Sequence, residues 1–430
     1  MSLTMTRRSF YMGAAAALSA ARVFGANDRI RVGIVGLGGR SRDHQAGYLK
    51  IPEAQITGLC DVNQAARERA QARLVQAGAA KALEFNDMRE MFANSNIDAV
   101  SIVTPNHWHA LACIWACQAG KDVYVEKPAS HNIHETFRMI EVARQTRRMV
   151  QVGSQGRSTP YKIHAIELAQ GGAIGKLYAA KGVCFKRRKS IGHTPVEPVP
   201  AGLDWNMFLG PAQLKEYTKN RFAYNWHWFW DTGNGDIANQ GAHEMDFCRW
   251  AFGNAGFPKT VVSTGGKYVY NDDQETPNTQ YATLSYDGYE ISFEVRGLLT
   301  GPEGGLPVKP GNTIGDILFG SEGWMWVDND GFQVYKGESN EQIMAGKPAP
   351  GEDPTVLHLK NFLGACRSRN YKDLHADVEI GATSAAFCHL ANISYRVGRQ
   401  LTWDHAAKHF VNDPAADALM TRNYRAPFVV

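Results

Sequence analysis

The 430-residue sequence carries little net charge and has no long apolar run after its N-terminal region. Its 46 lysine and arginine residues nearly balance 42 acidic ones, and the formal charge of +4 is too small to indicate nucleic acid as a partner. No stretch is long and apolar enough to cross a bilayer, so we expect no membrane span. Internal repeats and low-complexity segments are also absent after the N-terminal region.

Cysteine is sparse, and its spacing fits neither a disulfide framework nor a zinc site. The seven cysteines are odd in number and scattered, mostly inside apolar segments. Cys113 and Cys117 lie at helical spacing, but no second pair or histidine partner completes a metal pattern, so core packing explains them better. We therefore expect no disulfide framework and no metal.

The N-terminal segment has the order of an export signal. Thr6-Arg7-Arg8-Ser9-Phe10 precedes a weakly apolar, alanine-rich run from Met12 to Ala21. The segment is similar to a twin-arginine signal, although Tyr11-Met12 stands where leucine and lysine are usual; an amphipathic or disordered tail is the alternative. We expect residues 1–27 to be a signal peptide that sends the protein to the periplasm or out of the cell. Such cargo folds in the reducing cytoplasm, which explains the shortage of cysteine pairs.

A dinucleotide-binding fingerprint opens the first half of the chain. The β-branched run Arg31–Val35 leads into Gly36-Leu37-Gly38-Gly39-Arg40-Ser41, and a helix-compatible segment follows. Gly36 permits a tight turn, and Gly38 lets the backbone approach a pyrophosphate at the N-terminus of that helix. Ser41 replaces the third glycine, which predicts looser packing of the helix on the strand. The expected cofactor contacts in this turn are Gly36, Gly38, Gly39, Arg40 and Ser41.

An acidic residue follows the second strand at the distance this fingerprint requires. The strand Ala54–Leu59 ends at Cys60-Asp61, about twenty residues beyond the glycine turn. A carboxylate at this position hydrogen-bonds the ribose hydroxyls of the cofactor and repels a 2′-phosphate. Asp61 therefore favours NAD over NADP, and Arg67 or Arg69 on the next helix is weak evidence for NADP.

The strand Asp98–Val103 ends in a loop rich in polar residues, Thr104-Pro105-Asn106-His107-Trp108-His109. This loop should face the cofactor, because ligands bind outside the carboxyl ends of parallel strands. Its two histidines lack a third ligand nearby. Thr104, Asn106 and His109 are therefore interpreted as hydrogen-bonding cofactor contacts and not as metal ligands.

The following strand places a lysine at its carboxyl end. Val123-Tyr124-Val125 leads into Glu126-Lys127-Pro128, and a cation in that crevice is costly unless it has a task. A lysine that turns out to solvent beside Glu126 is the alternative. A further strand occurs at Met149–Gly153, and the right-handed crossover rule predicts a doubly wound parallel sheet, the Rossmann fold.

The second half of the chain has the pattern of an antiparallel sheet with two long helices. Strand-like runs separated by Asn, Asp and Gly turns occur at residues 260–264, 280–285, 290–295 and 324–327. Helical patterns at 355–367 and 378–399 should pack on this sheet or return to the first domain. We therefore divide the mature α/β chain into a Rossmann domain (28–153), a substrate-binding α/β domain (154–403) and an irregular, polar C-terminal extension (404–430).

The densest polar chemistry lies between residues 225 and 246. Asp236 is expected to be the N-cap of a helix that begins near Ile237, with Asn239 and His243 four apart on one face. The aromatic run before it is either core or a cover for the apolar faces of a sugar. The basic run Lys186–Lys189 is either a solvated loop or a cationic rim over the site. Substrate contacts are assigned to Asn225, Trp226, His227 and Asp236.

Three of these motifs together resemble a known family. The glycine-rich turn, the Thr104-Pro105-Asn106 loop and Glu126-Lys127-Pro128 resemble the glucose-fructose oxidoreductase, inositol dehydrogenase and MocA (Gfo/Idh/MocA) family over the whole mature chain. The resemblance implies a Rossmann domain that binds NAD or NADP, and a C-terminal α/β domain whose largely antiparallel, open-faced sheet meets a sugar or polyol. It also implies that Lys127 is catalytic and that dimers or tetramers form through the outer face of that sheet.

One position departs from the family pattern. There an acid four residues before a histidine completes the site with the lysine; His243 matches the histidine, whereas Asn239 replaces the acid. An amide takes no proton but still orients substrate. We expect His243, with a pKa near neutrality, to accept the hydroxyl proton while Lys127 stabilises the developing alkoxide. Glu126 either contacts the nicotinamide end of the cofactor or balances the lysine.

The resulting hypothesis is an oxidoreductase that transfers hydride between NAD, which can stay tightly bound, and a secondary hydroxyl of a sugar, glycoside or polyol. The alternative is an NAD-dependent glycoside hydrolase or lyase that acts through a transient keto intermediate. In that branch the lysine of Glu-Lys-Pro is commonly altered, so Lys127 favours the dehydrogenase. A non-catalytic nucleotide or sugar sensor is a third class, consistent with the change at Asn239. The expected partners are a carbohydrate substrate and further copies of this chain.

Overall fold

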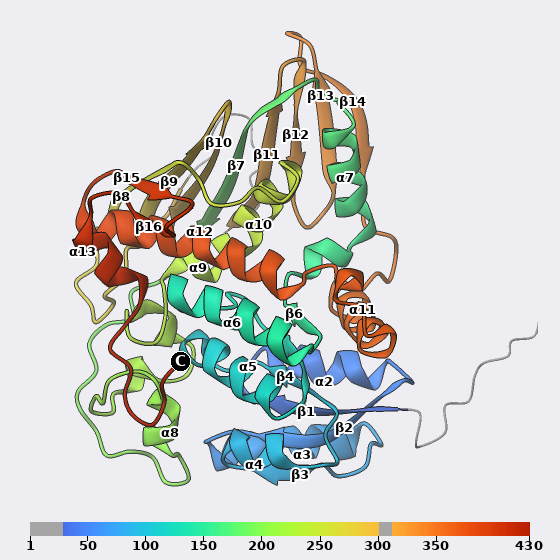
Figure 1. Ribbon diagram of the computed structural model, residues 1–430, viewed down its shortest axis with the longest axis vertical. Coiled ribbons are helices and arrows are strands. Elements are labelled where there is room, and N and C mark those ends of the chain that lie inside the picture. Colours follow the sequence, from blue (N-terminus) through green and yellow to red (C-terminus); the bar gives the residue numbers. More distant parts are fainter. Residues whose placement is uncertain (1–28, 301–311) are drawn as a thin grey trace, which may run out of the picture.

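The computed structural model describes residues 29–300 and 312–430, and it contains two sheets joined by long helices (Figure 1). The N-terminal sheet is parallel, with the strand order β3-β2-β1-β4-β5-β6. Its strands are β1 (Ile30–Val35), β2 (Ala54–Cys60), β3 (Leu83–Phe85), β4 (Ala99–Ile102), β5 (Asp122–Val125) and β6 (Val150–Val152). The order reverses between β1 and β4, so the predicted doubly wound Rossmann sheet is confirmed. The predicted export signal lies outside the described residues.

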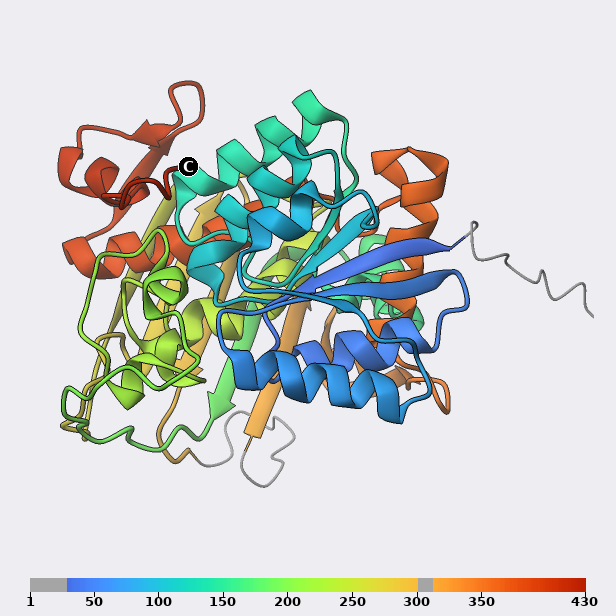
Figure 2. The same ribbon diagram turned by 90° about the horizontal axis from the view of Figure 1, so that it is seen from below.

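Helices cover both faces of the parallel sheet (Figure 2). One face packs on α2 (Ser41–Leu49) and α3 (Gln64–Gln76); the other packs on α4 (Met88–Ala93), α5 (His109–Gln118) and α6 (Ile133–Thr146). Val32 and Ile34 of β1 are wholly buried against the first pair. Each such side chain contributes about 1.5–3 kcal/mol by leaving water. The near-continuous apolar strands of the sequence reflect this burial on both faces.

The C-terminal sheet is mainly antiparallel, as predicted. Its strand order is β14-β13-β12-β11-β7-β10-β9-β8-β15-β16, and β7 with β10 is its parallel pair. The strands are β7 (Leu177–Lys186), β8 (Thr260–Gly266), β9 (Thr279–Tyr286), β10 (Tyr289–Arg296), β11 (Asn312–Gly320), β12 (Gly323–Val327), β13 (Phe332–Lys336), β14 (Glu341–Gly346), β15 (Leu401–Asp404) and β16 (His409–Phe410). The central strand β7 was not predicted, because Ala179, Lys181 and Gly182 have low β propensity.

Alternation along the strands gives this sheet two different faces. Ile291, Phe293 and Val295 of β10 point into a core shared with α10 (Gly241–Ala251), α12 (Val378–Val397) and α7 (Pro160–Gln170). The opposite face, which we call the outer face, carries a smaller apolar cluster. Its members are Val183, Phe185, Ile317 and Trp326, with the partly buried Phe319 and Trp324 packed against them.

Two long helices tie the sheets together. Helix α11 (Pro354–Ser368) returns to the N-terminal domain, where Leu359 and Phe362 are wholly buried beside α2. Helix α12 crosses the middle of the molecule between the two sheets (Figure 1). Ala382 near its start packs in the Rossmann core, whereas Phe387 packs in the core of the C-terminal sheet. Both helices match the predicted ranges to within two residues.

The C-terminal extension runs back along the N-terminal domain after α13 (Pro414–Asp417), and the C-terminus lies beside α5 and α6 (Figure 1). The ring of Phe428 packs edge-on against Trp108, with centroids 5.4 Å apart. Arg425 Nη1 donates to Asn206 Oδ1 at 2.7 Å, next to α8 (Trp205–Leu209). The extension therefore links α8 to the loop that follows β4. Within the two described ranges, no helix has the length and apolar character of a membrane span.

Candidate active site

The carboxyl end of β5 faces the junction between α9 (Asp236–Asn239) and α10. Lys127 Nζ donates a hydrogen bond to the backbone oxygen of Asn239 at 2.6 Å. This contact joins the two domains, and the lysine lies close enough to His243 for its charge to lower the pKa of that imidazole. Burial lowers the pKa of Lys127 itself, while Glu126 and then Glu244 oppose that shift. Lys127 therefore does not turn out to solvent.

The glycine turn leaves room for a ligand. Gly36 has a φ of +86°, and a Cβ there would lie 2.6 Å from Thr104 N, so the turn itself requires glycine. Gly38 and Gly39 are exposed, and a Cβ at either would meet no other atom of the described chain within 4 Å. The fold gives no reason for these two glycines, whereas a ligand that needs close backbone approach does. A dinucleotide pyrophosphate fits this turn.

Two polar side chains hold the turn in shape. The Ser41 hydroxyl donates to Gly38 O at 2.7 Å, and Ser41 is wholly buried. This bond closes the turn itself, and the looser helix packing predicted at this position stays a prediction. Asp61 Oδ2 accepts from Leu37 N at 2.6 Å, and Asp61 is partly buried at the end of β2. Burial raises the pKa of Asp61 above its ordinary value, and the two backbone amide donors moderate the shift.

Glu126 is the centre of a buried network that links the turn to β5. Its Oε1 accepts from Arg40 Nε at 2.9 Å and from Gln155 Nε2 at 3.1 Å, and it lies 2.9 Å from His44 Nε2. Burial alone would raise the pKa of Glu126, but Arg40 and His44 hold it well below its usual range. Glu126 thus balances Arg40 as much as Lys127. His44 and Gln155 were missed in the sequence, since no motif marks these long-range partners.

The loop after β4 is held mainly by its own hydrogen bonds. His109 is 1 % exposed; its Nδ1 lies 2.7 Å from Pro128 O and its Nε2 2.8 Å from Thr104 O. The Nδ1 contact joins this loop to the one after β5, whereas the Nε2 contact stays within the loop, and a neutral imidazole donates its one N–H to only one of these carbonyls. The cofactor contact of His109 stays a prediction. Asn106 Nδ2 donates to Asn234 Oδ1 at 2.6 Å, which ties the loop to the second domain. Thr104 Oγ1 is buried without a hydrogen-bond partner in the described residues.

The segment around Asn239 is not the single helix that the sequence predicts. Helix α9 ends at Asn239, α10 begins at Gly241, and Gln240 joins them. His243 N donates to Gln240 O at 2.9 Å, not to Asn239 O as a continuous α-helix would require. The carbonyl of Asn239 is thereby left free for Lys127. Lys127 therefore contacts the backbone of Asn239 and not its side chain.

Asp236 is not the helix N-cap that the sequence predicts; its side chain pairs with an arginine instead. The N-cap of α9 is Gly235, with φ +70°, and Asp236 is the first helical residue. Its carboxylate makes two bonds with the Arg188 guanidinium, at 2.7 and 2.8 Å, and accepts from Asn239 Nδ2 at 3.0 Å. Arg188 comes from the basic run Lys186–Lys189, so one member of that run is partly buried and paired in the site. Sequence reasoning singled out the run but not this residue.

The two histidines of the site are neutral at physiological pH. Burial, followed by the charge of Lys127, lowers the pKa of His243 to about 3. Burial likewise lowers the pKa of His227 to about 3. The expected pKa of His243 near neutrality is therefore wrong. A neutral imidazole with so low a pKa accepts a hydrogen bond from a hydroxyl but does not retain its proton.

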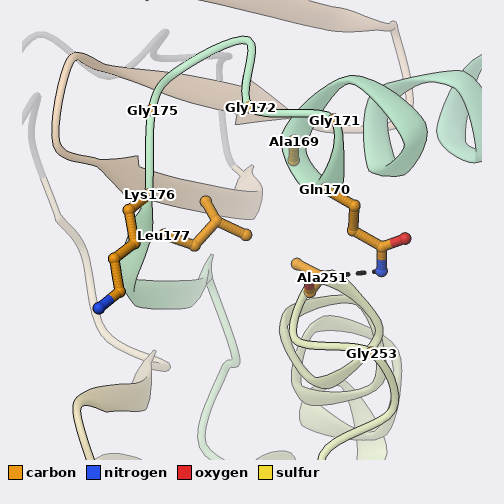
Figure 3. A pocket seen from close by; sticks show the side chains of 9 residues that line it. All are labelled: Ala169, Gln170, Gly171, Gly172, Gly175, Lys176, Leu177, Ala251 and Gly253. Atoms are coloured by element: carbon orange, nitrogen blue, oxygen red, sulfur yellow. Dashed lines mark hydrogen bonds between the residues drawn. The ribbon is translucent and has the colours of Figure 1, made fainter.

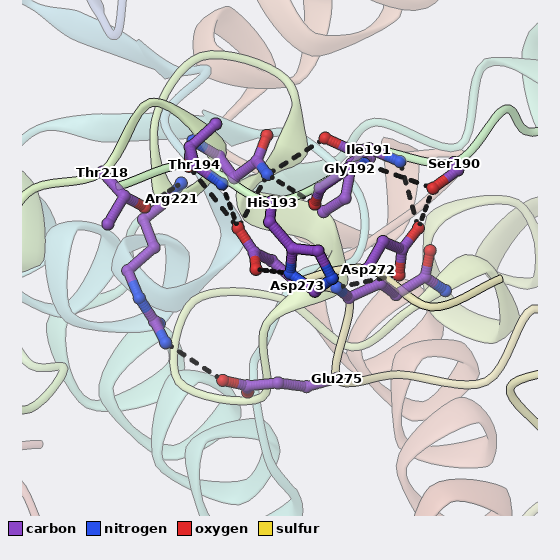
Figure 4. A network of polar contacts seen from close by, with 12 residues as sticks. Ser190, Ile191, Gly192, His193, Thr194, Thr218, Arg221, Asp272, Asp273 and Glu275 are labelled. Carbon is purple, nitrogen blue, oxygen red and sulfur yellow. Dashed lines mark hydrogen bonds and ion pairs between the residues drawn. The ribbon is translucent and has the colours of Figure 1, made fainter. Parts of the chain in front are cut away.

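The aromatic segment that contains His227 is fixed by a polar clamp. The His227 ring stacks on Trp226 with centroids 3.6 Å apart, and Asn225 Nδ2 donates to Asn220 Oδ1 at 3.2 Å. Asn220 in turn donates to Asp273 Oδ2 at 2.9 Å, within the network of Figure 4. Arg221 and Glu275 add an ion pair at 3.1 Å. This clamp ties the long connection after β7 to the β8–β9 loop, and so positions Asn225, Trp226 and His227.

A surface hollow of about 540 Å³ lies elsewhere, between the end of α7 and the end of α10 (Figure 3). It is lined largely by glycine and alanine, and Gln170 Nε2 donates to Trp250 O at 2.8 Å beside it. Ala251 in its wall is eight residues beyond His243, or about 12 Å along the helix axis. The hollow brings no titratable side chain except Lys176, and it is separate from the candidate active site.

Comparison with known proteins agrees with this organisation. A curated relative, a glycosyl hydrolase family 109 protein of Saccharopolyspora erythraea, is 24% identical over 219 residues, which cover 50% of this chain and 42% of that protein. The chain therefore spans less than half the length of that relative.

Solved structures match over far more of the chain. The WlbA dehydrogenase from Bordetella pertussis, in complex with NADH and UDP-GlcNAcA, has a TM-score of 0.65 at 21% identity, over 87% of this chain and 99% of that one. Levoglucosan dehydrogenase, in complex with NADH and levoglucosan, has a TM-score of 0.66 at 17% identity, with the same two coverages. At these identities the likeness establishes the fold.

Two family models match most of the described chain. One, described as "Oxidoreductase family, NAD-binding Rossmann fold", matches residues 30–154. The other, "Oxidoreductase family, C-terminal alpha/beta domain", matches residues 179–279 and 330–430. With the doubly wound sheet, the glycine turn and the antiparallel second sheet, these matches show that the chain belongs to the Gfo/Idh/MocA oxidoreductase family.

Proposed function

We propose that the protein is an NAD-dependent oxidoreductase that acts on a secondary hydroxyl of a sugar, glycoside or polyol. The observation that carries this proposal is the meeting of Lys127 with Asn239 and His243 beside a glycine turn whose Gly38 and Gly39 face open space. The likeness to two dehydrogenases with NADH and a sugar or sugar nucleotide in their structures supports it. A bound nicotinamide supplies the hydride acceptor.

The side chains of the candidate active site have separate roles in the proposed reaction. Lys127 donates hydrogen bonds to the reacting oxygen and stabilises negative charge that develops on it. His243, neutral at physiological pH, accepts a hydrogen bond from the hydroxyl and orients it. Asp236, with its charge balanced by Arg188, holds the Asn239 amide in place for a second hydroxyl. Asn225, Trp226 and His227 border the same space and are assigned to the sugar ring.

We assign NAD and not NADP as the cofactor. The Asp61 carboxylate stands at the end of β2, where it would repel a 2′-phosphate. Arg67, the candidate phosphate ligand, is engaged instead: its Nη1 donates to Asp61 O at 2.5 Å and to Asn86 Oδ1 at 3.2 Å. Identification of the nucleotide released from denatured protein tests the assignment. Release of NADP, or of no nicotinamide nucleotide together with no affinity for added NAD, would contradict it.

Two glycine substitutions should separate cofactor binding from folding. Gly38→Val fills the open space where a pyrophosphate would lie, so NAD affinity should fall at least about tenfold while the unliganded protein unfolds at the wild-type temperature. Gly36→Ala is strained at positive φ and meets Thr104, so it should destabilise the fold itself, by about 1 kcal/mol or more. NAD titration and thermal unfolding of both variants check this. Wild-type NAD affinity in Gly38→Val would place the cofactor elsewhere.

The alternative function is an NAD-dependent glycoside hydrolase or lyase, and a specific observation favours it. The curated relative from Saccharopolyspora erythraea is named a glycosyl hydrolase family 109 protein. In this alternative a keto intermediate forms on the sugar and the glycosidic bond is then lost by elimination. Product analysis with aryl glycosides distinguishes the two. A keto-sugar that accumulates supports the oxidoreductase, whereas released aglycone with unchanged redox state of the cofactor supports the hydrolase.

Homo-oligomers are proposed to form through the outer face of the C-terminal sheet. The half-exposed Phe319 and Trp324 lie on that face, and Tyr178 beside Phe319 is 53 % exposed. An apolar, aromatic patch of this kind is usual where protein surfaces associate. Light scattering of the purified protein should give the mass of a dimer or tetramer. A monomer at micromolar concentration would rule this assembly out.

Periplasmic or secreted localisation is proposed from the twin-arginine segment at Arg7 and Arg8. A variant with Arg7→Lys and Arg8→Lys keeps the charge of the segment but removes the arginine pair that defines the signal. The full-length variant should stay in the cytoplasm with its N-terminus intact, while the unchanged protein is exported and shortened. Equal export of the two proteins, measured by cell fractionation and N-terminal sequencing, would contradict this localisation.

A further inference from the structure

Asn234 is a buried amide in the glycine-rich segment just before α9, and the proposed chemistry gives it no role. It is 8 % exposed and stands between Gly233 and Gly235. A Cβ at Gly233 would lie 2.3 Å from His227 O, and Gly235 N donates to that same oxygen at 3.0 Å. The two glycines thus let the backbone that carries Asn234 pack directly against His227.

Three polar groups of Asn234 bond to three different parts of the chain. Its Oδ1 accepts from Asn106 Nδ2 at 2.6 Å, in the loop after β4. Its Nδ2 donates to His131 O at 3.1 Å, in the loop after β5. Its backbone oxygen accepts from Asn392 Nδ2 of α12 at 2.9 Å. Asn234 therefore joins the expected cofactor loop, the loop that carries Lys127, and the helix that crosses between the two sheets (Figure 1).

The backbone carbonyl of His131 fixes the direction of these bonds. A carbonyl oxygen only accepts, so the Nδ2 of Asn234 has to face it, and the Oδ1 of Asn234 then faces Asn106. Asn106 meets that oxygen through its own Nδ2, so one backbone atom determines the orientation of both amides. A carboxylate in place of Asn234 would keep the acceptor for Asn106 but would lose the donor to His131 O.

His131 is itself held from two sides. Its N donates to Glu135 Oε2 of α6 at 2.7 Å, and its Nδ1 accepts from Arg422 Nη1 at 3.2 Å. The hydroxyl of Tyr424, also in the C-terminal extension, donates to Glu135 Oε1 at 3.0 Å, and Glu135 is wholly buried. The carbonyl that orients the two amides is thus fixed by α6 and by the C-terminal extension.

We propose that Asn234 is a positioning residue that sets the cofactor loop and the Lys127 loop relative to each other and to α9. This role rests on the proposed oxidoreductase function. The chemical step requires the reacting atoms to approach within about 3–3.5 Å in a fixed orientation. Asn234 ties together the segments that support the cofactor, the lysine and the substrate, so this geometry is largely formed before the substrate binds.

The first test is Asn234→Leu, which has a similar volume but neither donor nor acceptor. Asn106 Nδ2 and His131 O would each lose a partner, so the two loops would no longer be tied. The affinity of nucleotide-free protein for NAD, measured by calorimetry, should fall about tenfold. In the loaded enzyme, kcat for sugar oxidation should fall about tenfold or more, while the KM for sugar should change little.

A matched control is Asn361 of α11, outside the candidate active site. Its amide makes the same kind of bonds, since Nδ2 donates to Asp373 O at 2.8 Å and Oδ1 accepts from His375 N at 2.9 Å. Asn361→Leu should lower the unfolding temperature and leave both NAD affinity and kcat at the wild-type values. The comparison separates the positioning role of Asn234 from the general cost of removing a bridging amide.

The second test, Asn234→Asp, depends on the direction of the hydrogen bonds and not on packing. A protonated carboxyl group supplies one donor and one acceptor, as the amide does, whereas a carboxylate supplies acceptors only. Burial raises the pKa of an aspartate, so the protonated form should prevail at about pH 5 and the ionised form at about pH 8. NAD affinity should therefore match the wild type at about pH 5 and be about tenfold weaker at about pH 8. This comparison remains decisive if Asn234→Leu fails to fold.

The outcomes separate the role of Asn234 from the function on which it rests. A folded Asn234→Leu protein with wild-type NAD affinity and kcat overturns the positioning role alone. So does an Asn234→Asp protein whose NAD affinity, relative to the wild type, is the same at both pH values. A wild type that binds NAD but oxidises no sugar overturns the oxidoreductase function, and the affinity measurements still decide whether Asn234 sets the cofactor loop. Weaker binding and lower kcat in Asn234→Leu, with recovery of Asn234→Asp at acid pH, support the proposal.

Discussion

Lys127→Met should lower kcat for sugar-dependent reduction of the nicotinamide by about 10²–10⁴-fold, the range expected when a positioned proton-transfer group is lost. Methionine keeps most of the side-chain volume but removes the Nζ donor that reaches Asn239 O at 2.6 Å. It also removes the positive charge that faces Glu126 and Glu244. Because the lost interactions concern the reacting oxygen, kcat should fall far more than KM rises.

A matched control lies at the other end of the same strand. Lys121 precedes β5, is 9 % exposed, and donates to Asn94 O and Ile97 O at 2.9 and 2.8 Å. Lys121→Met loses comparable bonds to backbone carbonyls but lies at the amino end of the strand, away from the site. It should lower the unfolding temperature and leave kcat unchanged. The contrast separates the chemistry of Lys127 from the general cost of removing a buried lysine.

The nucleotide content of each variant has to be measured with its activity. If Lys127→Met retains bound nicotinamide nucleotide and loses turnover, the lysine acts in the chemical step. If it loses the nucleotide as well, its main role is in binding. Undiminished reduction of the bound nicotinamide by sugar in Lys127→Met would remove the lysine from the mechanism.

The sequence is most informative where one short segment determines one local structure. The glycine turn at Gly36 and Gly38 needs only its own backbone and the helix that follows, and the turn forms as predicted. Alternating apolar residues likewise predicted β9 and β10, since period-two patterning reports a half-buried strand directly. Fold class and family follow from such local signals.

The site is less predictable, because its contacts cross long stretches of chain. The partner of Asp236 is Arg188, and the partners of Glu126 include His44; no spacing in the sequence marks either pair. The break at Gln240 was also missed, since residues 236–251 have an unbroken helical pattern and only the contact of Lys127 with Asn239 O reveals its use. The low pKa of His243 depends on burial, which a sequence does not give.

The largest effect on stability should come from breaking the ion pair beneath α10. Asp246 accepts from Arg157 Nε and Nη2 at 2.8 and 2.9 Å and from Ser384 Oγ at 2.6 Å, which ties α10 to α12. Asp246 and Arg157 are 3 and 4 % exposed. Asp246→Ala would leave a buried guanidinium without its partner, and removal of one member of such a pair costs about 3–5 kcal/mol. Asp287→Asn, which breaks the exposed pair with Lys259, should cost less than about 1 kcal/mol.

The loss of stability in Asp246→Ala should depend on pH, and the direction of the pKa shift of Asp246 gives the sign. Burial alone would raise the pKa of Asp246, but Arg157 and Ser384 hold it below its ordinary value. Its stabilising effect is therefore complete above the pKa of an unfolded aspartate, about 3.9, and is lost as pH falls through the lower folded value. At pH 7, urea unfolding should show the full difference in unfolding free energy between Asp246→Ala and the wild type. This difference should become smaller only below about pH 4.

A double variant decides whether the ion pair itself stabilises the fold, or whether the single variant is unstable only because it leaves a buried charge without a partner. Arg157→Met with Asp246→Leu replaces both charges by apolar side chains, and such replacements are often neutral or stabilising. In one outcome, the double variant regains the wild-type free energy of unfolding while its kcat stays low. In that case the ion pair serves to position α10, and with it His243 and Glu244, relative to Lys127. If Asp246→Ala alone unfolds at the wild-type urea concentration, the pair contributes nothing, and the position of α10 must depend on its apolar contacts with Phe293 and Phe387.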